Sequence, residues 1–167
     1  MYLNNNGNIT FEDAVSEYTP IPLPVAERPM ILPYWADVDT RLRTGLANPA
    51  ENLVYYHIDS AEGRMVVTWF DVGYYNQHND LRISFQLGLT NRFSSEGGDF
   101  DVEFRYNRCE WTTGDASDEP GGPDAIGGFG GVPAQAGFDA GDLENFVALP
   151  DSITGNIHTR LCEDSNI

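Results

Sequence analysis

Two aspartates stand two residues apart in the stretch WADVDTR at positions 35–41. In an extended strand alternate residues face the same side, so Asp37 and Asp39 would point the same way. Two like charges held side by side repel each other unless a neighbour compensates them. Such a pair could be an acid/base pair, a cation site or a structural element. We expect the structural role, with Arg41, Arg43 or backbone amides keeping both carboxylates ionised.

Catalysis by paired carboxylates is not favoured, because the sequence singles out no pair. A glycosidase needs two carboxyl groups across a sugar, one of them with a raised pKa. Five residues qualify equally by type and strand position: Asp37, Asp39, Asp71, Asp101 and Glu103. Nucleophilic catalysis is no better supported, since the three histidines (His57, His78 and His158) accompany no GxSxG serine. The Gly-rich stretch GGFGG lacks the Lys-Ser/Thr of a phosphate loop. We predict no catalytic residue.

A calcium site is the sharper reading of the acidic segments in the second half of the chain. Ca²⁺ takes six to eight oxygen ligands, which carboxylates and carbonyls on a Gly-rich backbone can supply. The run GDASDEPGGPD at 114–124 and the following FDAGD are such segments, although neither has the EF-hand spacing. The candidate ligands are Asp115, Asp118, Glu119, Asp124, Asp139 and Asp142, with Asp37 and Asp39 as a further pair. The alternative is an ordinary acidic loop, with no cofactor at all.

The net charge of the chain excludes several classes of partner. It is −17, and all nine basic residues are arginines. A field of that sign repels phosphate backbones and anionic lipid surfaces, so we expect no nucleic-acid partner. No apolar run approaches the roughly 18–20 residues that a membrane-spanning helix needs, so we also expect no transmembrane segment. The simpler meaning of the acidity is a solvated surface in a salty or extracellular setting.

The elements that must position these residues are mostly strands. An Asn-Gly turn between apolar flanks in YLNNNGNITF predicts a hairpin, and a Pro-rich linker follows it. Runs rich in Val, Ile and aromatic residues, several of them alternating, predict five more strands. These runs cover 31–38, 52–58, 64–75, 81–90 and 100–106, with SSEGGD at 94–99 as a hairpin loop. We therefore predict a single, mainly β domain with antiparallel, sandwich-like sheets.

The rest of the chain is harder to assign. Residues 114–142 are dominated by Gly, Asp, Ala and Pro, and predict a long loop that is either functional or packed through small residues. Within it AQAGFDAGD predicts a short helix or turn. After it ENFVALP predicts a late strand, and ITGNIHTRLC a short helix or another strand. One or two short helices are therefore expected at most.

Cysteine and aromatic residues each leave two alternatives open. Cys109 and Cys162 could form one disulfide or remain two buried thiols, and their number alone does not decide. The aromatic residues could stack on a sugar, but Trp and Tyr on alternating strands more often belong to the core. The aromatic candidates are Trp35, Trp69 and Trp111 with Tyr55, Tyr56, Tyr74 and Tyr75.

The order of the motifs resembles one known family. NNNGNITF, YTPIPLP, ILPYWADVDTR, VVTWFDVGYY, SFQLGL, WTTG, PAQAGFDAGD and NFVALPDS follow one another along nearly the whole chain. This series is similar to that of the NIDO domain, a nidogen-like extracellular module. The residues that carry the resemblance are Trp35, Asp37, Asp39, Trp69, Trp111 and Phe138.

The resemblance implies a non-catalytic extracellular or cell-surface module of a larger adhesion or matrix protein. Its partners would be an extracellular protein or glycan and the neighbouring modules of the parent chain. An oxidising compartment makes a Cys109–Cys162 disulfide the expected alternative. Members of the family continue beyond the SN near Ile167, so we expect residues 1–167 to be one domain excised from a longer chain, its last strand missing or supplied elsewhere. The competing hypothesis is a carbohydrate-binding or, less readily, hydrolytic domain that uses exposed aromatics and carboxylates.

Overall fold

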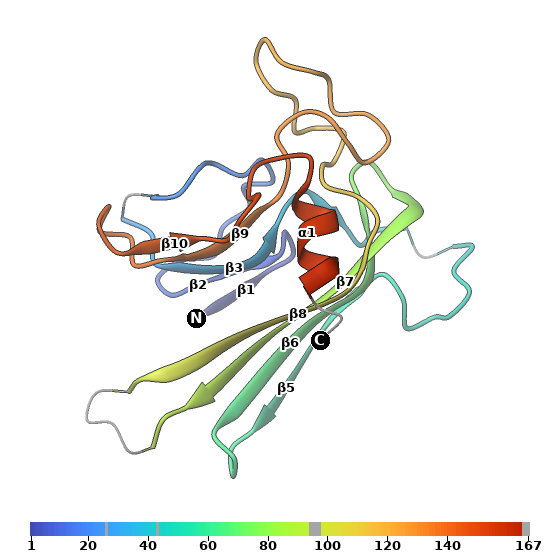
Figure 1. Ribbon diagram of the computed structural model, residues 1–167. Helices are drawn as coiled ribbons and strands as arrows, with labels where there is room; N and C mark the ends of the chain where they lie inside the picture. Colours follow the sequence, from blue (N-terminus) through green and yellow to red (C-terminus); the bar gives the residue numbers. More distant parts are fainter. Residues whose placement is uncertain (26, 43, 94–97, 165–167) are drawn as a thin grey trace.

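The computed structural model describes residues 1–25, 27–42, 44–93 and 98–164, which form two antiparallel sheets and one helix (Figure 1). The first sheet has the strand order β1-β2-β3-β9-β10. Its strands are β1 (Tyr2–Asn4), β2 (Asn8–Thr10), β3 (Met30–Trp35), β9 (Gln135–Asp139) and β10 (Phe146–Ala148).

The second sheet has the order β4-β6-β7-β8, and β5 pairs with β6 beside this path. Its strands are β4 (Val38–Asp39), β5 (Leu53–Asp59), β6 (Arg64–Tyr74), β7 (His78–Asn91) and β8 (Phe100–Cys109). The helix α1 (Ile157–Asp164) follows β10 and contacts β8. The predicted class, mainly β with antiparallel sandwich-like sheets, is confirmed.

The first sheet begins with the predicted Asn-Gly hairpin. Gly7 has φ +76°, and a Cβ there would collide with the carbonyl oxygen of Tyr34 on β3. Glycine is therefore required both for the turn and for the close approach of β3. The outer face of β3 buries Met30, Leu32 and Trp35 against Val25 of the Pro-rich linker, so the linker covers this face of the sheet.

The second sheet is built on the alternation of long strands. Val67 and Trp69 of β6 face the first sheet and are buried, whereas Thr68 points the other way and accepts a hydrogen bond from Gln86 at 2.8 Å. The register places Trp69 opposite Phe85 of β7, and Phe85 opposite Tyr106 of β8. Adjacent strands therefore present their apolar side chains on one common face. The predicted 94–99 loop lies between β7 and β8, and residues 94–97 fall outside the described part of the chain.

The two sheets meet tightly at one end of the sandwich. There the Trp69 and Phe85 rings stack with centroids 4.8 Å apart, and the Tyr34 ring meets Trp111 edge-on at 5.8 Å. The Tyr34 hydroxyl donates to the Trp111 carbonyl at 2.6 Å, and the Trp111 indole N–H donates to the Val72 carbonyl at 3.1 Å. The polar tips of these buried aromatics are therefore satisfied inside the core. We call this region the closed end.

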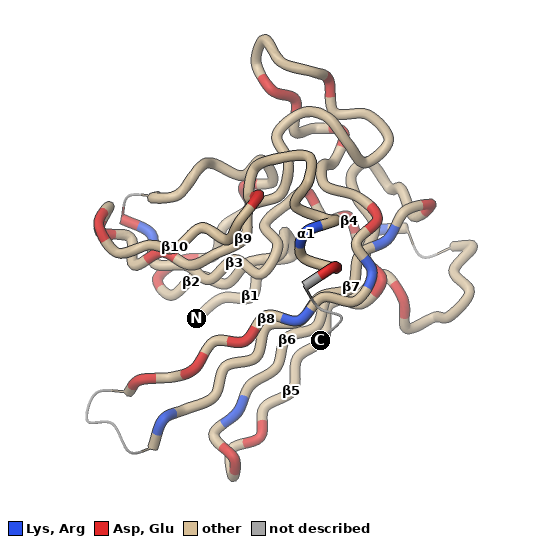
Figure 2. The backbone as a smooth tube through the Cα atoms, viewed as in Figure 1, with Lys and Arg blue, Asp and Glu red and all other residues tan. Residues whose placement is uncertain are grey.

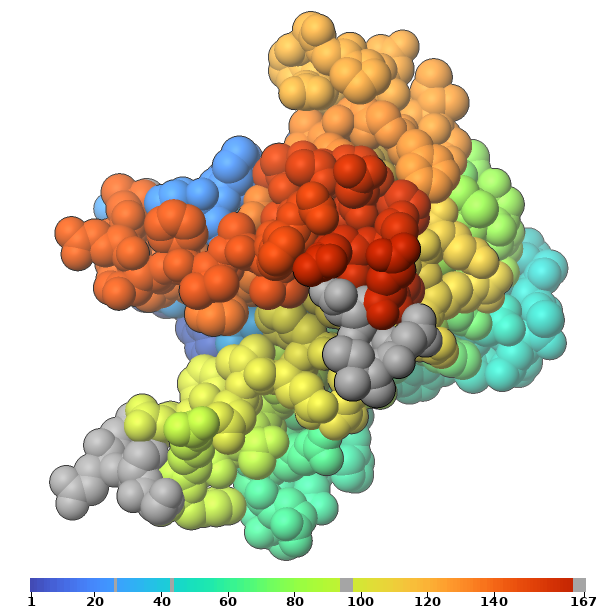
Figure 3. All heavy atoms as spheres, in the orientation of Figure 1, coloured from blue at the N-terminus to red at the C-terminus, as the bar shows by residue number. Residues whose placement is uncertain are grey.

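Away from the closed end the sheets diverge. In Figure 1 the strands β5–β8 run downward from the closed end while β9, β10 and the N-terminal strands extend to the side, and Figure 3 shows a hollow between the two lobes. Apolar side chains of both sheets reach this hollow without being covered. We call this region the open end.

The prediction of a helix or turn at AQAGFDAGD is wrong, because its central residues form β9. This strand is an interior strand of the first sheet, pairing with β3 on one side and β10 on the other. Ala134 and Ala136 are fully buried, and a Cβ at Gly137 would collide with the Val147 carbonyl oxygen. Small residues are needed here because neighbouring backbone packs closely, and two pairing partners outweigh a weak strand propensity.

The Gly-rich segment between β8 and β9 packs through small residues, which was one of the two predicted alternatives. The Gly128 carbonyl accepts hydrogen bonds from the amides of Thr112 and Thr113 at 2.7 and 3.1 Å. A Cβ at Gly131 would collide with the Ser117 carbonyl oxygen. The predicted late strand is β10, and of the two alternatives for ITGNIHTRLC the helix is observed as α1.

Candidate functional site

Asp39 is held as expected by Arg41 and by backbone amides. Burial alone would raise its pKa, but hydrogen bonds from the Arg41 side chain and from the amides of Arg41 and Gln77 outweigh burial and lower the pKa. Both amides donate at 2.9 Å, and the guanidinium of Arg41 forms an ion pair with the carboxylate. Asp39 therefore stays ionised. The other suggested partner, Arg43, lies outside the described residues.

Asp37 has a different environment. Burial, and then the nearby charges of Asp39 and Asp115, raise its pKa to about 6, although Arg41 and the Ala116 amide act in the opposite direction. Its Oδ2 atom is buried without a hydrogen-bond partner among the described residues. A Cβ added to Gly114 would collide with the Asp37 side chain, so the WTTG motif packs directly on the WADVD motif. The two aspartates are thus part of a junction between motifs.

The junction is completed by the turn between β6 and β7. The Tyr75 amide donates to the Asp37 carbonyl at 3.0 Å, and the Asp115 amide donates to the Tyr75 carbonyl at 2.6 Å. His78 Nε2 lies 2.7 Å from an Asp115 carboxylate oxygen. These contacts connect the Asp37 segment, the turn between β6 and β7, and the Asp115 segment, so the junction has a structural role.

The calcium candidates are dispersed. Within the described ranges no three His, Cys, Asp or Glu side chains come together as a metal-binding group. Asp118 accepts from the Ala125 amide at 2.8 Å, and Asp139 from the Val25 and Gly141 amides at 2.6 and 2.7 Å. Asp124 and Glu119 are exposed in the same loop. Several of these carboxylates thus cap backbone amides in turns, which is an ordinary structural role.

Asp142 shows the turn role most clearly. Its carboxylate accepts from the Asn145 side chain at 2.6 Å and from the amides of Asn145 and Glu144 at 2.7 and 2.9 Å. These bonds, with the Asn145 side chain first, lower its pKa to about 2. The carboxylate therefore closes the β9–β10 turn, and calcium binding there stays a prediction.

The remaining carboxylates considered for catalysis are also engaged. Asp71 accepts from the Ser84 hydroxyl at 2.7 Å, Asp101 pairs with Arg92, and Glu103 lies 2.6 Å from Arg105. His57 is exposed on β5, and the His158 ring meets Phe129 edge-on. None of these contacts sets one carboxylate against a second across an open cleft.

All three tryptophans are fully buried. Their indole N–H groups donate to backbone carbonyls: Trp35 to Glu17, Trp69 to Asn5 and Trp111 to Val72, at 2.9 to 3.1 Å. The predicted core role of the tryptophans is therefore the observed one. Tyr74 is buried as well, and Arg41 lies over the Tyr75 ring. Only Tyr55 and Tyr56 on β5, among the aromatics first considered for sugar stacking, are exposed.

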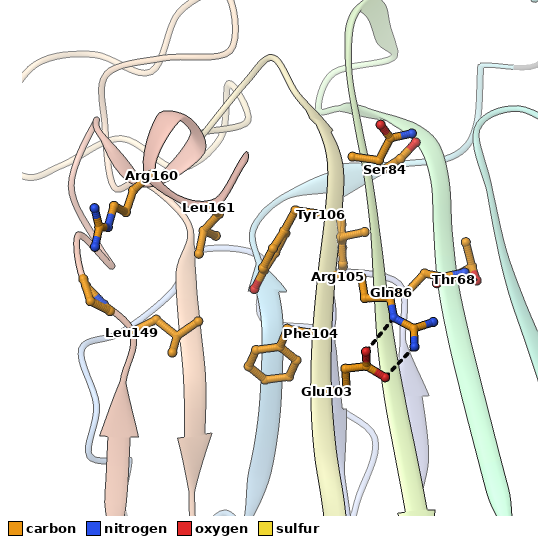
Figure 4. A pocket seen from close by; sticks show the side chains of 13 residues that line it. Thr68, Ser84, Gln86, Glu103, Phe104, Arg105, Tyr106, Leu149, Arg160 and Leu161 are labelled. Carbon is orange, nitrogen blue, oxygen red and sulfur yellow. Dashed lines mark hydrogen bonds and ion pairs between the residues drawn. The ribbon is translucent and has the colours of Figure 1, made fainter. Parts of the chain in front are cut away.

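Two cavities lined partly by apolar side chains lie along β8, and sequence reasoning did not find them. At the upper end of β8 a cavity of about 760 Å³ lies between β8 and α1 (Figure 4). The side chains of Phe104 and Tyr106 from β8 enter it from one side, and Leu149 and Leu161 from the other. Arg160 lies at the rim. The Tyr106 hydroxyl donates to the Pro33 carbonyl at 2.7 Å, which anchors this end.

At the open end the same side of β8 borders a second cavity of about 540 Å³. Phe100 and Val102 of β8 line it and are 43% and 37% exposed. Facing them are Phe138 and Val147 of the first sheet, 40% and 45% exposed. We call the two cavities together the β8 groove. The available signal was the alternation of β8, but alternation predicts an apolar face and not whether that face is covered.

A disulfide bounds the upper end of the groove. Cys109 at the end of β8 is bonded to Cys162 of α1, with an S–S distance of 2.07 Å. The bridge holds α1 beside β8 and so positions Leu161 in the groove. Of the two alternatives left open by the sequence, the disulfide is the one observed.

The comparison with known proteins points to a single family. A family model described as the nidogen-like domain, NIDO, matches residues 1–167. The chain is 35% identical to mouse alpha-tectorin over 184 residues, which cover all of this chain and 8% of that protein. It is 30% identical to Drosophila melanogaster nidogen over 162 residues, which cover 85% of this chain and 11% of that protein. No solved structure matches significantly.

Alpha-tectorin and nidogen are extracellular matrix proteins, which places the chain outside the cell. The chain spans about a tenth of their length. Within the described residues, no helix has the length and apolar character needed to cross a membrane.

Proposed function

Because the chain belongs to the nidogen-like (NIDO) domain family, we propose that residues 1–167 are a single non-catalytic interaction module of a larger extracellular matrix protein. The observation that supports this proposal is the β8 groove. Large contiguous apolar surfaces on soluble domains mark contact sites for other macromolecules. The groove combines such a surface with a rigid, disulfide-bounded frame.

A protein ligand suits the groove better than a sugar does. Its walls carry phenyl and aliphatic groups, such as Phe100, Val102 and Phe138. Sugar binding depends on flat exposed aromatic rings beside hydrogen-bonding groups, and all three tryptophans are buried. The lack of a carboxylate pair across a cleft in the described part of the chain likewise supports a non-catalytic role.

The test is binding of the purified module to an array of extracellular matrix proteins and to an array of glycans. We expect saturable binding to a protein, weakened about tenfold or more by Val102→Glu, because the substitution places a charge on the apolar wall. Ile126→Glu serves as the control, since Ile126 is exposed in the Gly-rich segment and does not line the groove. Protein binding that Val102→Glu leaves unchanged would contradict the assignment to the groove.

Carbohydrate binding remains a second candidate on one observation. Tyr55 and Tyr56 are exposed on the edge strand β5, on opposite faces of the sheet. If this candidate holds, a glycan on the array binds the module, and Tyr56→Ala abolishes that binding while Val102→Glu does not.

Calcium binding is a further part of the proposal, confined to residues 114–142. Bound Ca²⁺ would stabilise the folded state by mass action. We expect millimolar Ca²⁺ to raise the melting temperature relative to EDTA, and substitution of Asp115 and Asp118 by Asn to remove that increase. An unchanged melting temperature would argue against any structural ion.

A further inference from the structure

Two buried carboxylate oxygens at the junction of the WADVD and WTTG motifs accept no hydrogen bond from any described residue. They are Oδ2 of Asp37 and Oδ1 of Asp115. Asp37 as a whole is only 6% exposed. A buried acceptor without a donor costs free energy unless a water, a proton or an ion satisfies it. Two such oxygens in one junction therefore point to a ligand that the polypeptide itself does not supply.

The Asp37 carboxylate is aimed at the segment that carries Asp115. A Cβ added to Gly114 would lie 2.8 Å from Asp37 Oδ2, and the Ala116 amide donates a hydrogen bond to the Asp37 carboxylate. Asp37 thus contacts the residues on both sides of Asp115. The negative charge of Asp115 acts on Asp37 in turn. The two ionised groups therefore repel each other unless a positive charge lies between them.

Two basic side chains beside the pair are engaged with other atoms. The Arg41 guanidinium forms an ion pair with Asp39 and donates to the Asn76 side chain at 3.1 Å. His78 Nε2 lies 2.7 Å from Oδ2 of Asp115, which is the other oxygen of that carboxylate. Neither side chain therefore satisfies Asp37 Oδ2 or Asp115 Oδ1.

A hard divalent cation suits these donors. Ca²⁺ prefers carboxylate and carbonyl oxygens, and its charge balances two carboxylates. Along the whole chain 26 acidic residues stand against nine arginines, so the surroundings attract cations (Figure 2). Within the described ranges no third His, Cys, Asp or Glu joins the pair in a metal-binding group. The remaining ligands would be backbone carbonyls and water.

We propose that Asp37 and Asp115 together bind one Ca²⁺ ion, which joins the segment between β3 and β4 to the Gly-rich segment after β8. With two carboxylates the dissociation constant is on the order of 1 mM, the range of extracellular calcium modules. This inference rests on the calcium binding proposed above and extends it to Asp37, which lies outside residues 114–142. The ion stabilises the junction and has no part in the β8 groove.

Thermal unfolding of the intact, disulfide-bonded chain tests the site. We expect about 10 mM Ca²⁺ to raise the melting temperature by roughly 3 °C over EDTA with NaCl at matched ionic strength. Mg²⁺ should raise it less, because Mg²⁺ gives up its own water reluctantly. Asp37→Asn and Asp115→Asn should each lose the calcium-dependent increase. An equal increase in the parent chain and in Asp37→Asn would mean that calcium only screens the net charge, and would overturn the proposal.

Asp118→Asn is the matched control. Asp118 belongs to the same Gly-rich segment, but its carboxylate accepts from the Ala125 amide. We expect this variant to keep the full calcium-dependent increase. If Asp118→Asn loses the increase while Asp37→Asn keeps it, the ion lies within residues 114–142, so the site proposed here fails and calcium binding by that segment stands. If calcium changes the melting temperature of no protein in the set, both fail.

A second measurement uses the unaltered chain and so does not depend on how the variants fold. Tb³⁺ takes oxygen ligands as Ca²⁺ does, and it luminesces when a nearby aromatic ring transfers excitation to it. The Tyr74 ring stacks on His78 with centroids 4.6 Å apart, and His78 contacts Asp115. We expect Tb³⁺ luminescence on excitation of the aromatic residues, displaced by Ca²⁺ at millimolar concentration. Luminescence that Ca²⁺ does not displace, or none at all, would overturn the proposal.

Discussion

The closed and open ends of the sandwich use the same alternating strands with opposite outcomes. At the closed end Trp69 and Phe85 are enclosed by Tyr34 of the other sheet. At the open end Phe100 and Phe138, which also lie on inner faces, remain 43% and 40% exposed. The difference is that the two sheets are joined by direct packing at one end and diverge at the other (Figure 1). Stability and binding are thus assigned to different ends of one core.

This division follows from what each end can bury. Apolar area removed from water stabilises the fold at about 25 cal/mol per Å². At the closed end this stabilisation is already present in the folded chain. At the open end the apolar area is buried only when another surface covers it. Four predictions test the division, from the largest expected effect to the smallest.

Trp69→Ala should cause the largest loss, about 5 kcal/mol in the free energy of unfolding, because it creates a cavity beside Phe85. It also leaves the Asn5 carbonyl without its indole donor. Urea denaturation followed by circular dichroism measures the change, and Trp69→Phe is the control that keeps an aromatic ring. A loss below about 1 kcal/mol would mean that the closed end is not the stabilising core.

Removing the disulfide should cost about 4 kcal/mol, because the bridge constrains a loop defined by a sequence separation of 53. The variant is Cys109→Ser with Cys162→Ser, compared with the oxidised and reduced parent chain in urea. The reduced parent and the double variant should agree. Equal stability of the double variant and the oxidised parent chain would contradict this prediction.

Asp37 should make the closed end pH-sensitive. Its pKa in the folded state, about 6, lies above the ordinary 3.8, so the folded chain binds the proton more tightly than the unfolded chain. The resulting stabilisation is complete below pH 3.8, declines as the pH rises and is lost above about pH 6. Asp37→Asn should remove this decline and stabilise the fold by about 2 kcal/mol at pH 7. Urea denaturation at each pH from 4 to 7 measures the free energy of unfolding of both proteins. A difference between the two proteins that stays constant over this range would contradict the assignment of the pH dependence to Asp37.

Val102→Thr should have the smallest effect, within about 0.5 kcal/mol, because the residue is partly exposed and Thr keeps the β-branched shape. Thermal unfolding measures it, with Val67→Thr at a fully buried position of the same face as the control. Similar losses at both positions would show that the open end is enclosed in solution.

Local patterns predicted much of the fold. The Asn-Gly turn and the alternation of residues 64–74 and 100–106 depend only on neighbours in the chain, and all three are observed. β9 was missed because Gln-Ala-Gly-Phe-Asp has little strand propensity of its own, and its pairing with β3 joins residues about a hundred positions apart.

The site was less predictable than the fold. Asp39 could be assigned to Arg41 because the two are neighbours in sequence. The raised pKa of Asp37 could not be predicted from the sequence, because it depends partly on Asp115, which only the folded chain brings close. The groove escaped notice for a related reason. The sequence of β8 contains its apolar face but no information on how the distant β9 and β10 are angled against it.

The Cys109–Cys162 bridge also has a mechanical consequence for the chain. Force applied to the two ends of the chain would pass from Cys109 directly to Cys162 through the covalent bond. Residues 110–161 would then lie outside the path of the load, which withholds about 180 Å of contour length at roughly 3.5 Å per residue. Under tension the first hairpin and the long strands could be stretched out, while the Gly-rich segment, β9 and β10 would remain a closed loop that reducing agents alone could extend.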